Sequence, residues 1–300
     1  MPSLRDYRDR IRSVKSTKKI TSAMKMVAAS KLRRAQDQAE ASQPYATTMA
    51  GMLARVAANV TIGPESSKLL VGTGSHQRHV LVVVTADRGL CGGFNSNLYR
   101  DAHKYAQELI AQGKDVSIIC AGTKGTALAR RNMPEHLEKN FSGITAKTPI
   151  EYVDSQEVSD YVLAQFEDGA FDVCTLIYNE FRSVLVQKPV RQQLIPFNLP
   201  SDVEANDNEE ETEGTKSPYD FEPQEEEILN ALLPKNIAVQ IFRAFLDSAA
   251  GEQAARMTAM DSATRNASEM IDDLTLQYNR ARQAYITKEL IEIISGAEAM

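Results

Sequence analysis

The sequence contains no tryptophan, and it has two long stretches without proline. None of its 11 prolines lies between residues 3 and 43 or between residues 235 and 300. Because proline is the strongest helix breaker, both ends of the chain can form long continuous helices. The helix breakers are confined to the middle of the chain, where we expect a different kind of structure.

Long hydrophobic runs and paired cysteines are also missing. The longest apolar runs are short, such as 80–84, whereas a membrane-spanning helix needs about 20 residues. The N-terminal stretch is charged and has no apolar core, which argues against a secretory signal. The three cysteines, Cys91, Cys120 and Cys174, and the four histidines form no disulfide or metal-binding pattern. We therefore expect an intracellular protein, soluble or peripheral to a membrane, without a metal or cofactor.

Charge is distributed unevenly along the chain. Residues 1–43 carry 11 basic and 4 acidic side chains, whereas residues 201–227 carry 1 basic and 12 acidic ones, within a net charge of −6. Such segments can be plain solvated faces. They can also steer association with partners of opposite charge.

The N-terminal region has the apolar spacing of a coiled-coil helix. Residues at intervals of three and four run through a first set and then shift phase: Leu4, Tyr7, Ile11 and Val14, followed by Ile20, Met24, Val27, Leu32 and Ala35. Ser3 followed by Asp6 predicts an N-cap. We expect one helix over 1–60, bent at Pro44, and a linker after it.

The C-terminal region carries a longer seam of the same kind. Alternating intervals of three and four connect Met257, Met260, Thr264, Ala267, Ile271, Leu274, Tyr278, Ala281 and Tyr285. A helix over 235–300 would be about 100 Å long, at ~1.5 Å per residue. Such a rod needs a partner, so we expect the two terminal helices to pair antiparallel. The longer C-terminal helix would then extend beyond the N-terminal one and end in an apolar tip.

The middle of the chain alternates between strand and helix patterns. The stretches with strand character are 79–85, 116–121, 173–179 and 184–195, with weaker ones at 141–144 and 149–153. Helical stretches are expected at 97–111, 122–131 and 155–167. This alternation predicts an α/β domain over 75–200 with a parallel or mixed sheet. An acidic flexible loop over 201–218 follows, and 219–300 contains the C-terminal helix.

No motif in the sequence supports a reaction. The glycines of GLCGG, at 89–93, follow a strand, but the segment lacks both the GK[ST] of a P-loop and the GxGxxG of a dinucleotide site. A tight turn is the favoured interpretation. Two other classes stay open on pattern alone: a nucleotide-binding enzyme that uses the α/β domain, and a free coiled-coil scaffold or nucleic-acid-binding protein that uses the basic helix.

Four segments resemble a known family. ITSAMKMVAASKLRRAQ at 20–36, TADRGLCGGFN at 85–95, EQAARMTAMDSATRNA at 252–267 and NRARQAYITKELIEIISGA at 279–297 closely resemble the gamma subunit of bacterial-type rotary (F-type) ATP synthases. The likeness covers essentially the whole chain. It implies a long antiparallel coiled coil of both termini plus a Rossmann-like α/β domain, in a subunit that is not itself catalytic.

The resemblance also implies a function and partners. A gamma subunit is the central rotor shaft, one copy per complex, inside a hexamer of alpha and beta subunits. Its foot binds the membrane c-ring and the epsilon subunit. Proton flow turns the ring, and the turning shaft couples this rotation to ATP synthesis or hydrolysis. The implied location is peripheral, at the cytoplasmic face of the bacterial inner membrane, with no nucleic acid bound.

Residue roles come from the same resemblance. Contact with the beta subunits is implied for Met24, Lys25, Arg256, Gln283, Thr287 and Glu289, of which Arg256, Gln283 and Glu289 are expected to lie off the seam. The foot on the c-ring is implied for Tyr219, Asp220, Phe221 and Glu222. The tip that turns in an apolar bearing is implied for Leu290, Ile291 and Ile294. The acidic loop 201–217 is either a solvated spacer or a regulatory contact.

Overall fold

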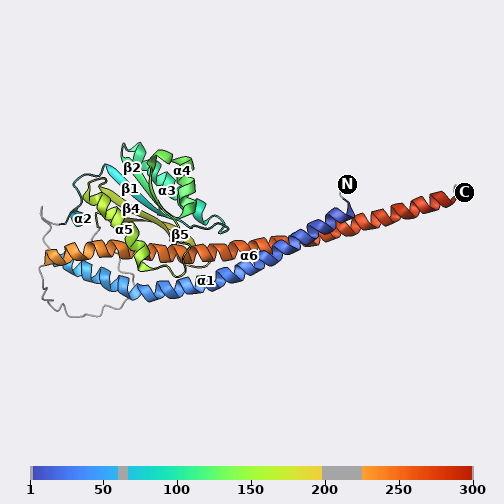
Figure 1. The fold of residues 1–300 in the computed structure, drawn as a ribbon, viewed down its shortest axis with the longest axis horizontal. Coiled ribbons are helices and arrows are strands. Elements are labelled where there is room, and N and C mark those ends of the chain that lie inside the picture. The colour runs from blue at the N-terminus through green and yellow to red at the C-terminus, as the bar shows by residue number, and fades with distance from the viewer. Residues whose placement is uncertain (1–2, 60–66, 198–224, 299–300) are drawn as a thin grey trace. The chain divides into compact units, whose positions relative to one another are not determined.

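The computed structural model describes residues 3–59, 67–197 and 225–298 (Figure 1). In chain order the elements are α1 (Leu4–Asn59), α2 (Lys68–Val71), β1 (Arg78–Val84), α3 (Phe94–Ala111), β2 (Asp115–Ala121), α4 (Thr123–Asn132), a short 3-10 turn (Pro134–His136), β3 (Leu137–Phe141), α5 (Tyr152–Glu167), β4 (Val173–Phe181), β5 (Gln187–Ile195) and α6 (Glu225–Glu298). They form two units, 31–255 and the pair 1–30 with 256–300.

A five-stranded sheet organises the unit 31–255. The strand order is β3-β2-β1-β4-β5, with β1 parallel to both β2 and β4, β2 parallel to β3, and β5 antiparallel to β4. Consecutive parallel strands are joined by the helices α3, α4 and α5, as a Rossmann-like sheet requires. The α/β fold class expected from the alternating pattern is confirmed.

Helices cover both faces of this sheet. On one face, α3 and α4 pack on alternate residues of β1 and β2, which include Leu81 and Val83. On the other face, α5 and the first part of α6 pack on the intervening residues, which include Val80 and Val82. Because both faces of β1 are covered, its sequence is a continuous apolar run.

Some predicted boundaries in this unit are wrong. The weak strand expected at 149–153 is absent from the described structure, since α5 already begins at Tyr152. Asp154 accepts a hydrogen bond from the Glu151 amide at 3.0 Å, which caps the first turn of that helix. The other weak strand lies at Leu137–Phe141 instead of 141–144, and β5 begins at Gln187 because Ser183 and Val186 close a tight turn.

Both terminal helices contain a proline. α1 continues through Pro44 to Asn59, as expected. α6 begins at Glu225, ten residues before the proline-free stretch, and passes through Pro234. A proline inside a helix costs about 3 kcal/mol, and here burial compensates. Leu229 and Leu233 of α6 pack beside Leu53 of α1 in one apolar cluster, so tertiary packing holds the first turns of α6 in helical form.

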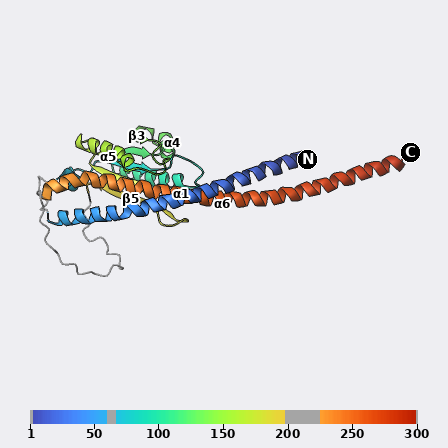
Figure 2. The same cartoon turned by 60° about the horizontal axis from the view of Figure 1, so that its bottom comes forward.

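Within the unit formed by 1–30 and 256–300, the two helices run antiparallel (Figures 1 and 2). The contacts that join them include Arg8 with Tyr278, Thr21 with Thr264, and Lys25 with Asp261. Along the shared interface, residue numbers rise on α1 in the direction in which they fall on α6. At the start of α1, Ser3 and Asp6 cap each other's backbone amides at 2.8 and 3.2 Å, which confirms the predicted N-cap.

The buried positions of α1 keep a single heptad spacing at the point where the sequence pattern predicted a shift of that spacing. Ile20 and Val27 are 56% and 57% exposed, whereas their neighbours Thr21 and Ala28 are buried at 8% and 1%. Thr21 meets Thr264 across the interface with their hydroxyl oxygens 2.8 Å apart. Small side chains at the seam allow the two helix backbones to lie close together. The packing gained in this way outweighs what burying the more hydrophobic Ile20 and Val27 would contribute. The predicted phase shift to Ile20 and Val27 is therefore wrong.

Candidate functional site

Met24 and Lys25, the two site residues predicted on α1, lie in the part of α1 that pairs with α6. Lys25 Nζ is 2.6 Å from Asp261 Oδ1, and Arg265 lies 3.2 Å from the other carboxylate oxygen. The hydrogen bond from Lys25 lowers the pKa of Asp261. Both partners are partly exposed to solvent. The contact therefore aligns the helices more than it stabilises them, since exposed ion pairs contribute little.

Met24 lies next to an apolar surface that no other residue of the described chain covers. Its side chain is half-buried, and the exposed Ile20, Met26 and Val27 lie within one or two turns of it on α1. Ile20 and Val27 are two helical turns apart and lie on one side of α1 with Met24 between them, whereas Met26 points to another side. The structure thus places Met24 and Lys25 at the margin of this surface.

Arg256 departs from its expected position. Only 8% of the residue is exposed, whereas the helical spacing had suggested a side chain off the seam. A buried guanidinium requires partners for its charge. Arg256 is therefore part of the interior of this chain, and its predicted contact with another subunit stays a prediction.

The other site residues predicted on α6 lie beyond its paired part. The contacts of Arg8 and Lys25 set the register, which places the partner of the first turn of α1 near residue 282. Gln283, Thr287 and Glu289 follow this point, and all three are exposed. The tip residues are exposed as well, with Leu290, Ile291 and Ile294 at 53%, 58% and 57%. The end of α6 is a single helix within its unit (Figure 1).

The predicted foot residues, Tyr219 to Glu222, and the acidic loop 201–217 lie outside the described residues. Among the helices that the structure does describe, none has the length and apolar character needed to cross a bilayer. In the same described ranges, no group of three or more His, Cys, Asp or Glu side chains is arranged to hold a metal ion.

The usual ligand crevice of a Rossmann-like sheet is filled in this chain. That crevice lies beyond the carboxyl ends of the strands where the strand order reverses, here between β1 and β4. Phe94, the first residue of α3, occupies the position and is 6% exposed. Asn179 of β4 donates to its carbonyl at 3.4 Å. Gly251 of α6 lies against its ring, so close that a methyl group there would be 3.1 Å from Cε2.

The second anion-binding position of the sheet, the N-terminus of α4, holds a carboxylate of the chain itself. Asp87 Oδ1 accepts hydrogen bonds from the Thr123 amide and hydroxyl at 2.9 and 2.7 Å, and Oδ2 accepts from the Thr145 hydroxyl at 2.8 Å. Burial raises the pKa of Asp87, but these hydrogen bonds outweigh it and lower the pKa overall. Asp87 thus joins the loops after β1, β2 and β3, where a phosphate could otherwise bind.

The GLCGG segment forms the tight turn that the sequence favoured. Leu90 and Gly92 have φ of 65° and 57°, the left-handed conformation that glycine adopts readily. Cys91 is buried, and its sulfur accepts a hydrogen bond from Asn95 at 3.2 Å. The turn serves packing around Phe94, which contacts Cys91 in a small apolar cluster.

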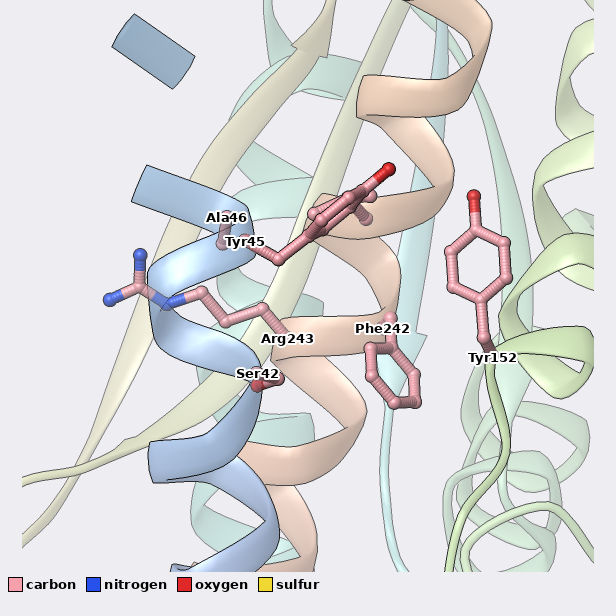
Figure 3. A pocket seen from close by; sticks show the side chains of 7 residues that line it. Ser42, Tyr45, Ala46, Tyr152, Phe242 and Arg243 are labelled. Carbon is pink, nitrogen blue, oxygen red and sulfur yellow. The ribbon is translucent and has the colours of Figure 1, made fainter. Parts of the chain in front are cut away.

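Sequence reasoning missed two surface features. One is a pocket between α1, α5 and α6, lined by aromatic residues that are distant in the sequence (Figure 3). The other is the exposed apolar pair Ile20 and Val27, because the spacing had assigned both residues to the seam. A search for large apolar residues next to small ones at seam positions would have indicated the second feature.

Together these features define a class: a subunit built on two long antiparallel helices, whose Rossmann-like domain has its ligand crevice closed by its own helices. Comparison with known proteins agrees. A family model described as ATP synthase matches residues 3–300. Over the full length of both chains, the sequence is 53% identical to the ATP synthase gamma chains of Rhodospirillum rubrum and of Methylorubrum populi.

Solved structures show the same fold. The central stalk and c-ring structure of the Tetrahymena thermophila mitochondrial ATP synthase contains a chain 25% identical, with a TM-score of 0.58, covering 81% of this chain and 99% of that one. A chain of the Euglena gracilis enzyme is 20% identical, with a TM-score of 0.67, covering 99% and 94%. The chain belongs to the ATP synthase gamma-chain family, which confirms the resemblance seen in the sequence.

Proposed function

We propose that this chain is the central rotor shaft of a bacterial proton-driven ATP synthase, coupling rotation of the c-ring to ATP synthesis or hydrolysis. The observation that carries the proposal is the antiparallel pairing of α1 with α6, held in register by contacts such as Arg8 with Tyr278. Two paired helices resist twisting better than one. The extended α6 adds an axial end on which the shaft can turn.

The shaft acts on partners, without a reaction of its own. It turns inside the alpha–beta hexamer, one copy per complex, with the epsilon subunit and the c-ring bound at its foot. Each orientation presents a different face to each beta subunit. Because that contact differs in strength between the nucleotide-affinity states of beta, rotation shifts the population among them.

Each predicted residue has a role in this mechanism. Met24 and Lys25 contact the beta subunit on the α1 side, and Gln283, Thr287 and Glu289 do so on the α6 side. The exposure of all but the half-buried Met24 supports direct contact. Arg256 acts differently, since its burial suits a residue that fixes the conformation of α6.

The two ends of the shaft have different chemistry. At the tip, Leu290, Ile291 and Ile294 turn in an apolar sleeve of the hexamer, where the absence of charge keeps rotation free of strong directional contacts. Tyr219 to Glu222 form the foot that binds the c-ring. In this proposal the chain is a peripheral subunit at the cytoplasmic face of the bacterial inner membrane.

The test is reconstitution of the complex with and without this chain. An alpha–beta–gamma complex of the source bacterium should hydrolyse ATP with single-molecule rotation of a bead attached to the exposed middle of β3. Met24→Lys in inverted vesicles should lower proton pumping per ATP hydrolysed, because it places a new cation at the contact with beta. A monodisperse free chain that never enters an alpha–beta hexamer would refute the proposal.

A further inference from the structure

The unit formed by 1–30 and 256–300 has a groove of about 470 Å³ on the surface of α1. Its lining comes from α1 and consists of Arg8, Ile11, Arg12, Lys15, Ser16 and Lys19. Residues three and four apart on a helix lie on the same side, so the four cations of this lining form a row. This basic row is about 17 Å long at ~1.5 Å per residue.

The chain neutralises little of the charge in the basic row. Residues 3–30 contain eight basic side chains and two acidic ones. The Arg8 guanidinium donates hydrogen bonds to the uncharged Tyr278 hydroxyl at 3.0 and 2.8 Å, and Arg12 lies 3.6 Å from Asp9. Lys15 and Lys19 are exposed, and neither forms an ion pair with a carboxylate of the described residues. Their charge is therefore available to a partner.

In the proposed function the alpha–beta hexamer encloses this part of α1. The basic row lies between two segments assigned to contacts inside the hexamer, Met24 with Lys25 on one side and the exposed end of α6 on the other. An ammonium group that loses its water requires a partner of opposite charge, because an unpaired buried charge is strongly destabilising. Among the described residues that line the groove none is aromatic, so a nucleic-acid base has no surface to stack on. Carboxylates of the enclosing protein are the partners that fit.

We propose that the basic row docks on Asp and Glu side chains of the inner wall of the alpha–beta hexamer. This contact rests on the proposed function and is separate from the one made by Met24. Lys19 and Ile20 are adjacent in the sequence and therefore lie about 100° apart around the helix. As the shaft turns, it presents the basic row and the apolar side of Ile20 to a given subunit at different orientations.

A carbodiimide cross-link tests the contact directly, because this reagent joins an amine to a carboxylate only where the two groups touch. In the alpha–beta–gamma complex, mass spectrometry should find Lys15 or Lys19 joined to an Asp or Glu of alpha or beta. Lys25 and Asp261, which lie 2.6 Å apart within this chain, are the internal positive control. If that internal link forms and neither Lys15 nor Lys19 is joined to alpha or beta, the proposal is overturned. The proposed function would survive this result, since it requires only that the complex assembles and rotates.

Charge removal gives an independent test. Lys15→Gln with Lys19→Gln should leave the folding of the chain unchanged, because both ammonium groups lack a partner within it. In the complex, the pair should lower the NaCl concentration that releases half of the chain on gel filtration by about twofold. Lys15→Glu with Lys19→Glu should weaken retention in the complex about tenfold, because like charges then face each other.

Arg130→Gln with Arg131→Gln is the matched control. This pair removes two exposed cations from α4, outside the basic row, and should leave the releasing NaCl concentration unchanged. A Gln pair at 15 and 19 that is as salt-resistant as the unmodified complex would overturn the proposal. So would full retention of the Glu pair in the complex.

Discussion

Lys25 Nζ lies 2.6 Å from Asp261 Oδ1 although 236 positions separate the two residues in the sequence. Lys25 is also proposed to contact the beta subunit, so exchanging the pair separates its two roles. Lys25→Asp alone should disturb both pairing and coupling, because two carboxylates then face each other. Adding Asp261→Lys should restore thermal stability but not the ratio of protons pumped to ATP hydrolysed.

The pH dependence of this ion pair follows from the direction in which the pKa of Asp261 is shifted. Lys25 lowers the pKa of Asp261, so the contribution to stability is present above the usual carboxyl range and is lost as pH falls through the lowered pKa. Carboxyl ¹³C NMR of Lys25→Gln should show the Asp261 midpoint move upward. An unchanged midpoint would mean that the ion pair does not form in solution.

Asp247 should cause the opposite pH behaviour. The pKa of Asp247 is raised to about 6: burial is the largest cause, Arg243 partly opposes it, and Glu180 adds to the rise; Tyr178 also faces the carboxyl group. The folded state therefore binds this proton more tightly than the unfolded chain, and stability falls as pH rises from about 4 to about 6.

Asp247→Asn should remove that penalty. We expect it to stabilise the fold by about 1–3 kcal/mol at pH 7.5, on the order of 1.4 kcal/mol per pKa unit, and to have little effect at pH 4. Urea unfolding at both pH values measures the difference. Asp115→Asn, at an exposed position, is the control and should be neutral at both. A destabilised Asp247→Asn at pH 7.5 would contradict the assignment.

Gly251 allows α6 to lie against Phe94 and Gln187. A methyl group there would be 3.1 Å from the Phe94 ring and 3.2 Å from Gln187 Cγ. Gly251→Val should destabilise the sheet domain by about 1–3 kcal/mol through overpacking. Phe94→Ala should be less harmful in the Gly251→Val background than alone, because the smaller side chain leaves room for valine. Additive losses in a double-mutant cycle would exclude this contact as the cause.

Gly122 is required where β2 leads into α4. It has φ of 115°, and a methyl group there would lie 2.1 Å from the Thr85 carbonyl oxygen. Gly122→Ala should cost more than 2 kcal/mol, combining backbone strain of about 1–3 kcal/mol with the collision. Gly113→Ala is the matched control, since its φ of 76° is also positive but the space around it is open. Equal losses in the two variants, measured by urea unfolding, would refute the collision argument.

The end of α6 should be dispensable for folding and required for assembly. Its side chains from Ile286 to Ile294 are exposed, so deleting 286–300 should leave the melting temperature of the chain within about 1 °C. The same deletion should weaken retention of the chain in the alpha–beta complex on gel filtration. Ile291→Asp with Ile294→Asp tests the apolar bearing without shortening the helix, and an unaffected complex would argue against a bearing there.

Local patterns in the sequence predicted much of the fold. The run at β1 is apolar because both faces of that strand are covered, and the spacing from Met257 to Ala281 reproduces the observed seam of α6. Ser3 and Asp6 form the expected cap. These features depend on side chains a few residues apart, so the sequence shows them directly. The resemblance of four segments to gamma subunits supplied the function and the residue roles.

Other features depend on what each residue meets across the structure. Thr21 replaces Ile20 in the seam because Thr264 lies opposite, and α6 passes Pro234 because α1 packs beside it. Arg256 is buried, which spacing along one helix did not reveal. The aromatic pocket joins Tyr45, Tyr152 and Phe242 from three elements.

Hydrophobic periodicity and capping are local, so the order of amino acids indicates directly where most helices and strands form. Which side of α1 is covered depends on the folded chain, and so does the closing of the crevice, where related sheets bind ligands, by Phe94 with Gly251 against it. Burial needs two surfaces that face each other, and these come from distant parts of the chain. The choice between two adjacent apolar residues depends on the size of the side chain that faces them from a distant part of the chain.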